Sequence, residues 1–233
     1  MSLIREIPPT AGWPLTIRSL VVSLFKKRRP GLLEEDFKKY LGASGALLTY
    51  SGTAAFYLIL ESIKKLSHKK TVIIPAFICP LIPLAIKRSG LNIKVCDTNA
   101  FNFDYDVTKL RGICKENNDI LAILAVHLGG LPIDFEALKE IAQTEGAFII
   151  EDCAQSLGAQ YHAKKTGSLG DFSFFSLCRG KGLSIYEGGL AVSNRAEHAQ
   201  ILKETAKEII NQDTPSECLK IAELFAYSIF YRP

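Results

Sequence analysis

The chain has 233 residues, of which 48% are hydrophobic and 22% are charged, and its formal net charge is +4. These values are close to those of an ordinary soluble globular chain that is long enough for one large domain. Much of the positive charge lies in the run 26–29, which is typical of a solvated turn after a helix; a patch facing phosphate or a membrane is the alternative. Because no aromatic and basic residues interleave along the chain, we expect no nucleic-acid partner.

The cysteines and the N-terminus indicate the cellular compartment. None of the six cysteines forms a C-x-x-C pair and each lies in an apolar context, which favours buried thiols in a reducing compartment over a zinc site. The N-terminus lacks an apolar signal region, and segment 15–29 is apolar for too few residues to span a bilayer. We therefore expect a cytoplasmic protein without a transmembrane segment, in which residues 1–29 form an N-terminal arm with an amphipathic helix.

Helical and strand patterns alternate along the rest of the chain. In chain order we predict a helix over 30–42, a helix over 51–66, a strand over 71–75, a helix over 81–90, a strand over 92–97, a strand within 119–130, a helix over 134–146, and strands over 147–152, 171–177 and 188–194, followed by a helix over 196–210. This alternation is typical of an α/β fold with a largely parallel sheet, in which ligands bind at the carboxyl ends of the strands. The apolar segment 219–233 suggests a chain cut before a second domain.

Three elements near the expected carboxyl edge could carry chemistry. "YSGTAA" (50–55) opens a helix at a glycine turn, which suits a phosphate but also a plain capped helix start. Asp152 follows a buried strand, where a carboxylate could bind a metal, act as a base, pair with a cationic ring nitrogen or simply cap the next helix. No ligand cluster surrounds it, so we expect no metal.

Lys181 is the third element, because it lies among small and apolar residues. A lysine is rarely buried without a partner, and desolvation would leave a nucleophilic amine suited to Schiff-base chemistry. The alternative is a lysine whose ammonium group reaches water. Together, a phosphate turn, an aspartate for a pyridine nitrogen and a lysine for an aldehyde are what pyridoxal 5'-phosphate (PLP) requires.

In these motifs the chain resembles the DegT/DnrJ/EryC1/StrS family of PLP-dependent sugar aminotransferases, which have the aspartate aminotransferase fold (fold type I). The resemblance runs from about residue 30 to 194 and rests on "SGTAA", "IIPAF", "VHLGGLPIDFEAL", "IIEDCAQSLGA", "KKTGSLGDFSFFS" and K-x5-EGG, in the family's order. It implies a PLP-binding large domain over 30–233, with a mostly parallel central sheet between helices and without the family's smaller C-terminal domain.

The resemblance also implies roles for single residues. Lys181 matches the lysine that binds the cofactor aldehyde, Asp152 matches the partner of the protonated pyridine nitrogen, and Gln155 matches the residue beside the ring and its 3-oxygen. Where the family stacks an aromatic side chain on the ring, this chain has Cys79, so either Cys79 packs on the ring or Phe77 substitutes for it. The implied phosphate-binding residues are Gly52, Thr53, Ala54 and Ser176.

The implied activity is transfer of an amino group to a nucleotide-linked keto-sugar, with glutamate as the expected amino donor. Because family members that carry out dehydration have histidine in place of the lysine, Lys181 favours transamination. The alternatives are a PLP sugar dehydratase or lyase, and a catalytically silent truncated homologue that acts as a regulatory or scaffold subunit. The family places the cofactor at a subunit interface, and the apolar residues of 219–231 and of 15–25 need cover. We therefore expect a homodimer.

Overall fold

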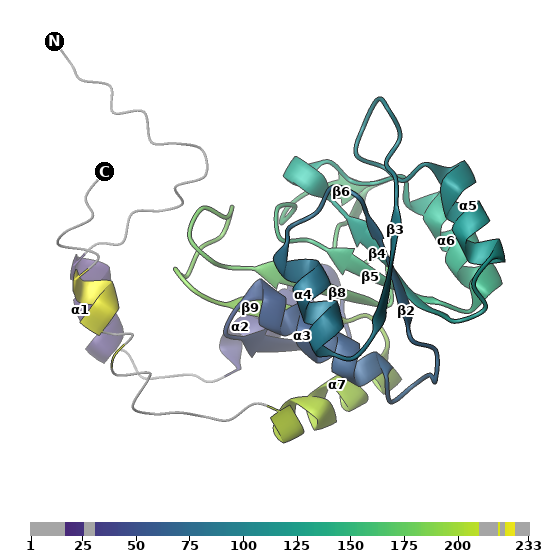
Figure 1. Ribbon diagram of the computed structural model, residues 1–233. Helices are drawn as coiled ribbons and strands as arrows, with labels where there is room; N and C mark the ends of the chain where they lie inside the picture. Colours follow the sequence, from purple (N-terminus) through teal and green to yellow (C-terminus); the bar gives the residue numbers. More distant parts are fainter. Residues whose placement is uncertain (1–16, 26–30, 210–218, 220–221, 227–233) are drawn as a thin grey trace, which may run out of the picture.

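The computed structural model describes residues 17–25, 31–209, 219 and 222–226. Its centre is one seven-stranded sheet (Figure 1). The strands, in order across the sheet, are β1 (Gly45–Thr49), β9 (Gly189–Ser193), β8 (Phe172–Ser176), β5 (Phe148–Asp152), β4 (Ile120–Val126), β2 (Thr71–Pro75) and β3 (Asn92–Cys96). Strand β9 runs antiparallel to both of its neighbours, and the other pairs are parallel. The prediction of an α/β fold with a mostly parallel sheet is confirmed.

Helices cover both faces of this sheet (Figure 1). Helices α3 (Gly52–Ile63), α4 (Leu81–Arg88) and α7 (Ala196–Ile209) pack with the sheet in one apolar cluster. On the other face lie α2 (Leu32–Leu41), α5 (Val107–Lys115) and α6 (Phe135–Glu145). Because both faces are buried, the central strands are almost continuously apolar, as in "TVIIP" of β2 and "ILAILAV" of β4.

Smaller elements complete the described chain. Helix α1 spans Ile17–Phe25, within the predicted N-terminal helix, a 3₁₀ turn η1 spans Leu128–Gly130, and a hairpin joins β6 (Gln160–Tyr161) to β7 (Lys164–Lys165). Among the described residues, none of the helices has both the length and the apolarity needed to cross a bilayer. Most of the apolar segment 219–233, on which part of the dimer prediction rests, lies outside the described residues.

The sequence prediction located the main elements and missed some of the shorter ones. The predicted helix over 51–66 ends at Ile63, and the one over 81–90 ends at Arg88, just before Gly90 with its φ of 71°. Strand β1, helix α5 and the β6–β7 hairpin were not predicted. Strand β1 ("GALLT") is short and its apolar residues do not alternate with polar ones, whereas α5 ("VTKLRGICK") has Val107, Leu110 and Cys114 at helical spacing, a signal that the prediction overlooked.

The start of α3 lies directly against the start of β9. Ser51 and Gly188 form a β-bridge, and a Cβ atom on Gly189 would collide with the carbonyl group of Ser51 and the amide nitrogen of Gly52. In the structure, the close neighbour of Gly189 is the chain's own helix-opening turn, which only a residue without a side chain can approach.

We predict that Gly189→Ala lowers the free energy of unfolding by about 3 kcal/mol or more, because the new methyl group must push two backbone segments apart. Urea denaturation followed by circular dichroism measures the loss. Gly112→Ala is the matched control: Gly112 lies in α5 with open space around it, so the change should be neutral or stabilise by up to about 1 kcal/mol. Equal stability of Gly189→Ala and the wild type would contradict this close approach.

Candidate active site

A cavity of about 370 Å³ opens at the carboxyl edge of the sheet, beside the start of α3 and the ends of β4, β5 and β8. Its volume falls within the range of about 300–1,000 Å³ that is usual for small-molecule sites. Seven of the residues predicted from the sequence line it together: Gly52, Thr53, Cys79, Asp152, Gln155, Ser176 and Lys181. The two predicted residues that do not line it are Ala54 and Phe77.

One end of the cavity is the first turn of α3. Ser51 caps the helix, since its Oγ accepts a hydrogen bond of 3.1 Å from the backbone N–H of Ala54. A Cβ atom on Gly52 would lie 3.0 Å from the Cβ of Ser176, so glycine lets the helix start sit on the end of β8. The N–H groups of the first helical turn have no acceptor within the helix and lie at its positive end. This end of the cavity therefore suits a phosphate group.

Asp152 is the last residue of β5 and is buried, with 7% of its surface exposed. Burial raises the pKa of its carboxyl group to about 6, although the Ala154 N–H group, Lys181 and His127 oppose that shift. The carboxylate Oδ1 accepts a hydrogen bond of 3.0 Å from Ala154, so Asp152 does make the local capping bond that the sequence allowed. The raised pKa means that the carboxylate lacks full compensation and would be stabilised by a cation in the cavity.

Lys181 lies in the loop that joins β8 to β9 and is half-buried. The base of this loop is closed by Leu177 N–H donating to Gly188 O at 2.9 Å and by Ile185 N–H donating to Leu177 O at 2.9 Å. Tyr186 adopts a φ of 71°, which is unusual for a residue other than glycine. The loop therefore has defined geometry at its base and presents Lys181 to the same cavity as Asp152.

The remaining predicted residues divide between the cavity and its rim. Gln155 accepts a hydrogen bond of 2.8 Å from the Gly129 N–H through its Oε1, which ties the loop after β5 to the turn after β4. Cys79 is exposed and lines the cavity. Phe77 instead lies beside Phe103, with ring centroids 5.2 Å apart. Of the two candidates for stacking on a bound ring, Cys79 is the one at the cavity.

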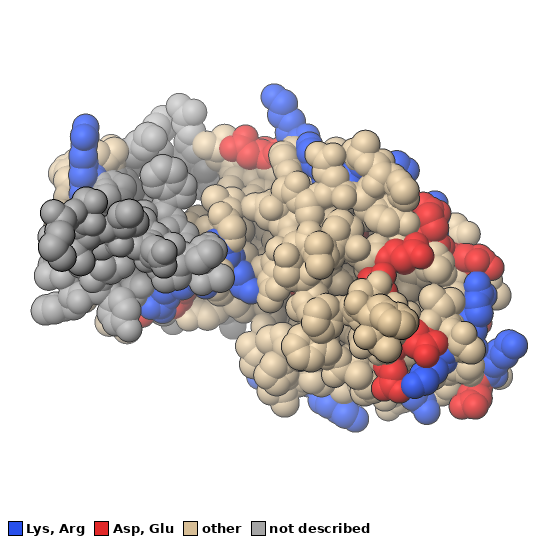
Figure 2. Space-filling model, turned by 90° about the horizontal axis from the view of Figure 1, so that it is seen from above, with Lys and Arg blue, Asp and Glu red and all other residues tan. Residues whose placement is uncertain are grey.

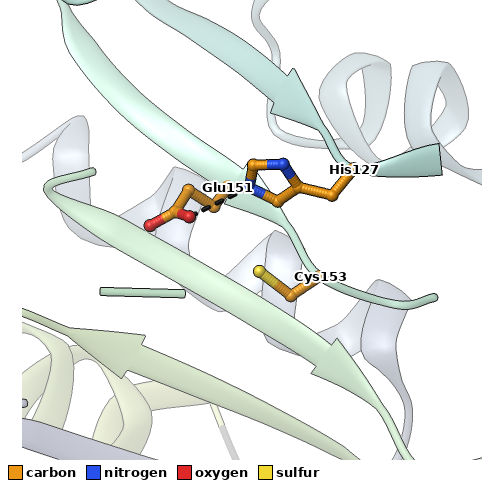
Figure 3. Close-up of side chains that lie close together, drawn as sticks. All are labelled: His127, Glu151 and Cys153. Atoms are coloured by element: carbon orange, nitrogen blue, oxygen red, sulfur yellow. Dashed lines mark hydrogen bonds and ion pairs between the residues drawn. The ribbon is translucent and has the colours of Figure 1, made fainter. Parts of the chain in front are cut away.

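A second polar cluster, which the sequence analysis missed, lies nearby: His127, Glu151 and Cys153 are all buried (Figure 3). His127 Nδ1 accepts a hydrogen bond from the Ile133 N–H at 3.2 Å, so Nε2 carries the proton and donates to Glu151 Oε2 at 3.0 Å. Glu151 also accepts hydrogen bonds from three backbone N–H groups, those of Gly167, Leu169 and Gly170.

This cluster has the residue types of a metal site, but its histidine and carboxylate atoms are already engaged within the protein. Burial raises the pKa of the Cys153 thiol well above its usual range, so this sulfur is held as a thiol rather than a metal-binding thiolate. The hydrogen bonds instead join the end of β4, β5 and the loop over 167–170, and His127 forms part of the cavity wall. The only sequence signal was the pair of acids that ends "AFIIED", which does not tell a ligand-facing acid from a buried one.

The mostly parallel sheet between helices, with a cavity at its carboxyl edge, is the arrangement of fold-type I PLP enzymes. A family model described as the DegT/DnrJ/EryC1/StrS aminotransferase family matches residues 27–215. The chain therefore belongs to this family, as the sequence motifs predicted.

Named relatives agree with this assignment. The chain is 31% identical over 174 residues to GDP-4-keto-6-deoxy-D-mannose 3-dehydratase of Yersinia pseudotuberculosis, covering 72% of this chain and 44% of the relative. It is 32% identical over 161 residues to GDP-perosamine synthase of Escherichia coli O157:H7, covering 69% and 43%. The chain thus spans less than half the length of these two relatives.

Among solved structures, the fold matches the PLP form of a protein described as a sugar aminotransferase, Spr1654 of Streptococcus pneumoniae. The TM-score is 0.74 at 23% identity, and the match covers 84% of this chain and 57% of that one. The predicted fold type is confirmed by this likeness, and the predicted cofactor is confirmed as that of the family.

We predict that Asp152→Asn stabilises the cofactor-free chain at neutral pH. The folded-state pKa of about 6 lies above the ordinary value of 3.8, so ionised Asp152 costs stability above about pH 6, and this cost fades as the pH falls to 3.8. The amide can keep the bond to Ala154 without the charge. Urea unfolding should show a gain of at most about 3 kcal/mol at pH 7.5, and a smaller gain at pH 4.5.

The exposed Asp36 provides the control. Asp36→Asn should change the free energy of unfolding by no more than about 0.5 kcal/mol. If Asp152→Asn were less stable than the wild type at pH 7.5, the buried carboxylate would be fully compensated in the cofactor-free protein, and the account of its raised pKa would be wrong.

Proposed function

We propose that this chain is the cofactor-binding large domain of a PLP-dependent sugar aminotransferase. The observation that carries the proposal is the meeting of Lys181, Asp152 and the first turn of α3 in one cavity. These are a nucleophilic amine, a buried carboxylate in need of a cation and a site for phosphate. Domain boundaries at residues 1–29 for an N-terminal arm and 30–233 for the large domain belong to the same proposal.

The residues that line the cavity have the chemistry that PLP requires. The N–H groups at Gly52 and Thr53, with the neighbouring Ser176, would hold the phosphate. Asp152, whose carboxylate lacks full compensation, would hold the ring nitrogen in its protonated state. Gln155 and Cys79 would flank the ring. When bound, PLP supplies an electron sink for the carbon from which a proton is removed.

The protein's own part in the chemistry then falls to two side chains. Asp152 would keep a proton on the ring nitrogen, because an ionised carboxylate in a buried site strongly favours a cationic partner. Lys181 would hold the cofactor through Nζ, and its amine, when free, would hold or move a proton as a general acid and base. Lys181 and Asp152 are thus the catalytic residues of the proposal.

For the substrate we propose a nucleotide-linked keto-sugar, with an amino acid, glutamate in the first instance, as the donor. The similarity to GDP-perosamine synthase supports the sugar class. The similarity to a GDP-sugar 3-dehydratase supports sugar dehydration as a second candidate. The lysine at position 181 favours amino transfer. Amino transfer would place the site in amino-sugar biosynthesis, and we place the protein in the cytoplasm.

We further propose a homodimer with the cavity mouth at its interface. Large apolar side chains near the mouth are exposed, among them Tyr50 at 66%, Leu81 at 50% and Leu84 at 63%. Much of the surface in Figure 2 carries neither acidic nor basic side chains. A second copy would remove the exposed Tyr50, Leu81 and Leu84 side chains from water. Sedimentation velocity at micromolar concentration should give a dimer, and a monomer with full cofactor occupancy would contradict this part of the proposal.

The proposal predicts a covalent label on Lys181. After incubation with PLP and reduction with borohydride, peptide mass spectrometry should find a pyridoxyl group on Lys181 in the wild type. Lys181→Ala should abolish the label and leave the fold intact, because removing a half-buried lysine costs little packing. The exposed Lys164→Ala, in β7, is the matched control and should keep the label.

Two outcomes would overturn the proposal. If Lys181→Ala kept a stoichiometric label, another amine would hold the cofactor. If the wild type took up no label at all at saturating PLP, the chain would be a catalytically silent homologue, and a regulatory or scaffold role would replace the enzymatic one.

A further inference from the structure

Two aromatic rings form an exposed pair beside the cavity mouth. Phe77 follows the end of β2 and directly precedes Ile78 and Cys79, which both line the cavity. Its ring lies 5.2 Å from that of Phe103, at an interplanar angle of 35°. Phe77 is 59% exposed and Phe103 is 51% exposed. Exposure of aromatic rings to water is unfavourable, so a pair of rings held together at the surface points to a ligand with a flat apolar face.

The loop that carries Phe103 is ordered by its own hydrogen bonds. Asn99 Oδ1 accepts from the N–H groups of Phe101 and Asn102, both at 2.9 Å, and a β-bridge joins Thr98 to Tyr105. The loop base is anchored by the buried Tyr105, whose hydroxyl donates to Leu124 O at 2.8 Å. Phe103 is therefore placed before any ligand arrives, which lowers the entropy cost of using it for binding.

We infer that Phe77 and Phe103 form a stacking platform for the base of a nucleoside diphosphate, the nucleotide half of the sugar nucleotide. This inference rests on the proposed function and adds the place where the nucleotide lies. A sugar that reaches the cavity floor must leave its diphosphate and base outside, along the rim. An aromatic face accepts any base, because every base has a π-face and stacking needs no hydrogen-bond readout.

The contact between the two rings also accounts for the position of Phe77 outside the cavity lining. Its ring turns towards Phe103 on the rim, while Cys79, two residues further on, occupies the wall. One short segment after β2 thus serves two adjacent subsites: the thiol faces the proposed cofactor site, and the ring faces the substrate's base.

Isothermal titration calorimetry of the PLP-loaded chain with GDP, UDP and inorganic pyrophosphate tests the platform. Phe103→Ala should weaken GDP and UDP binding about tenfold, the middle of the range for loss of one base–aromatic stack. Pyrophosphate, which has no base, should bind both proteins equally. Phe103→Leu keeps apolar area without a π-face, so it should lose most of the nucleotide affinity that the ring contributes. Phe103→Tyr should retain that affinity.

Phe101 supplies a matched control in the same loop. It is 98% exposed and makes no ring contact with the described residues, so Phe101→Ala should leave nucleotide affinity unchanged. Pyridoxal phosphate uptake, measured first by its absorption, should be the same in all variants. Loss of that uptake in the wild type would be a failure of the proposed function and not of the platform.

Three results would overturn the inference while the proposed function stood. The first is nucleotide affinity that is equal in the wild type and Phe103→Ala. The second is no nucleotide binding by a PLP-loaded wild type at millimolar concentration. The third is a Phe103→Ala variant that binds nucleotides normally but dissociates into monomers in sedimentation velocity, because the rings would then pack against a second copy.

Discussion

The backbone contact between Gly189 and the Ser51–Gly52 turn is the constraint on which the site depends. Strand β9 can reach this turn only because no side chain intervenes. The loop with Lys181 leaves β8 at Ser176 and returns into β9 at Gly189, and Ser176 in turn lies against Gly52. The helix start that suits a phosphate and the loop that carries the lysine are therefore fixed to each other through backbone, which is the stiffest connection available to a chain.

Two adjacent acids of β5 illustrate how stability and function divide in this fold. Glu151 faces one side of the sheet and accepts four hydrogen bonds, so its charge is compensated within the protein. Asp152 faces the cavity, has one backbone partner and a pKa raised to about 6 by burial. An acid of the first kind holds the structure together. An acid of the second kind lowers the stability of the cofactor-free protein until a cation binds beside it, as expected of a binding site.

The sequence predicted the framework well because buried parallel strands and amphipathic helices have strong periodic signals. It also predicted the grouping at the cavity, since acids and glycines at strand ends must meet at the carboxyl edge. Its misses have local causes. Strand β1 carries a weak period, α5 was overlooked despite apolar residues at helical spacing, and the cluster of His127 with Glu151 depends on loop 167–170 folding back, which no short motif encodes. The separation of Phe77 from the cavity depends on its contact with Phe103, a residue 26 positions away along the chain.

The central proposal is that Asp152 contacts the ring nitrogen of PLP. Nitrogen-15 NMR of the chain loaded with PLP labelled at the pyridine nitrogen measures the protonation of that atom. Because the buried Asp152 carboxylate lacks a full set of hydrogen-bond donors, we expect the pyridine nitrogen of bound PLP to be protonated and to stay protonated well above neutral pH. We also expect the proton to be lost in the Asp152→Asn variant at the same pH. An unprotonated nitrogen in the loaded wild type at neutral pH would contradict the account.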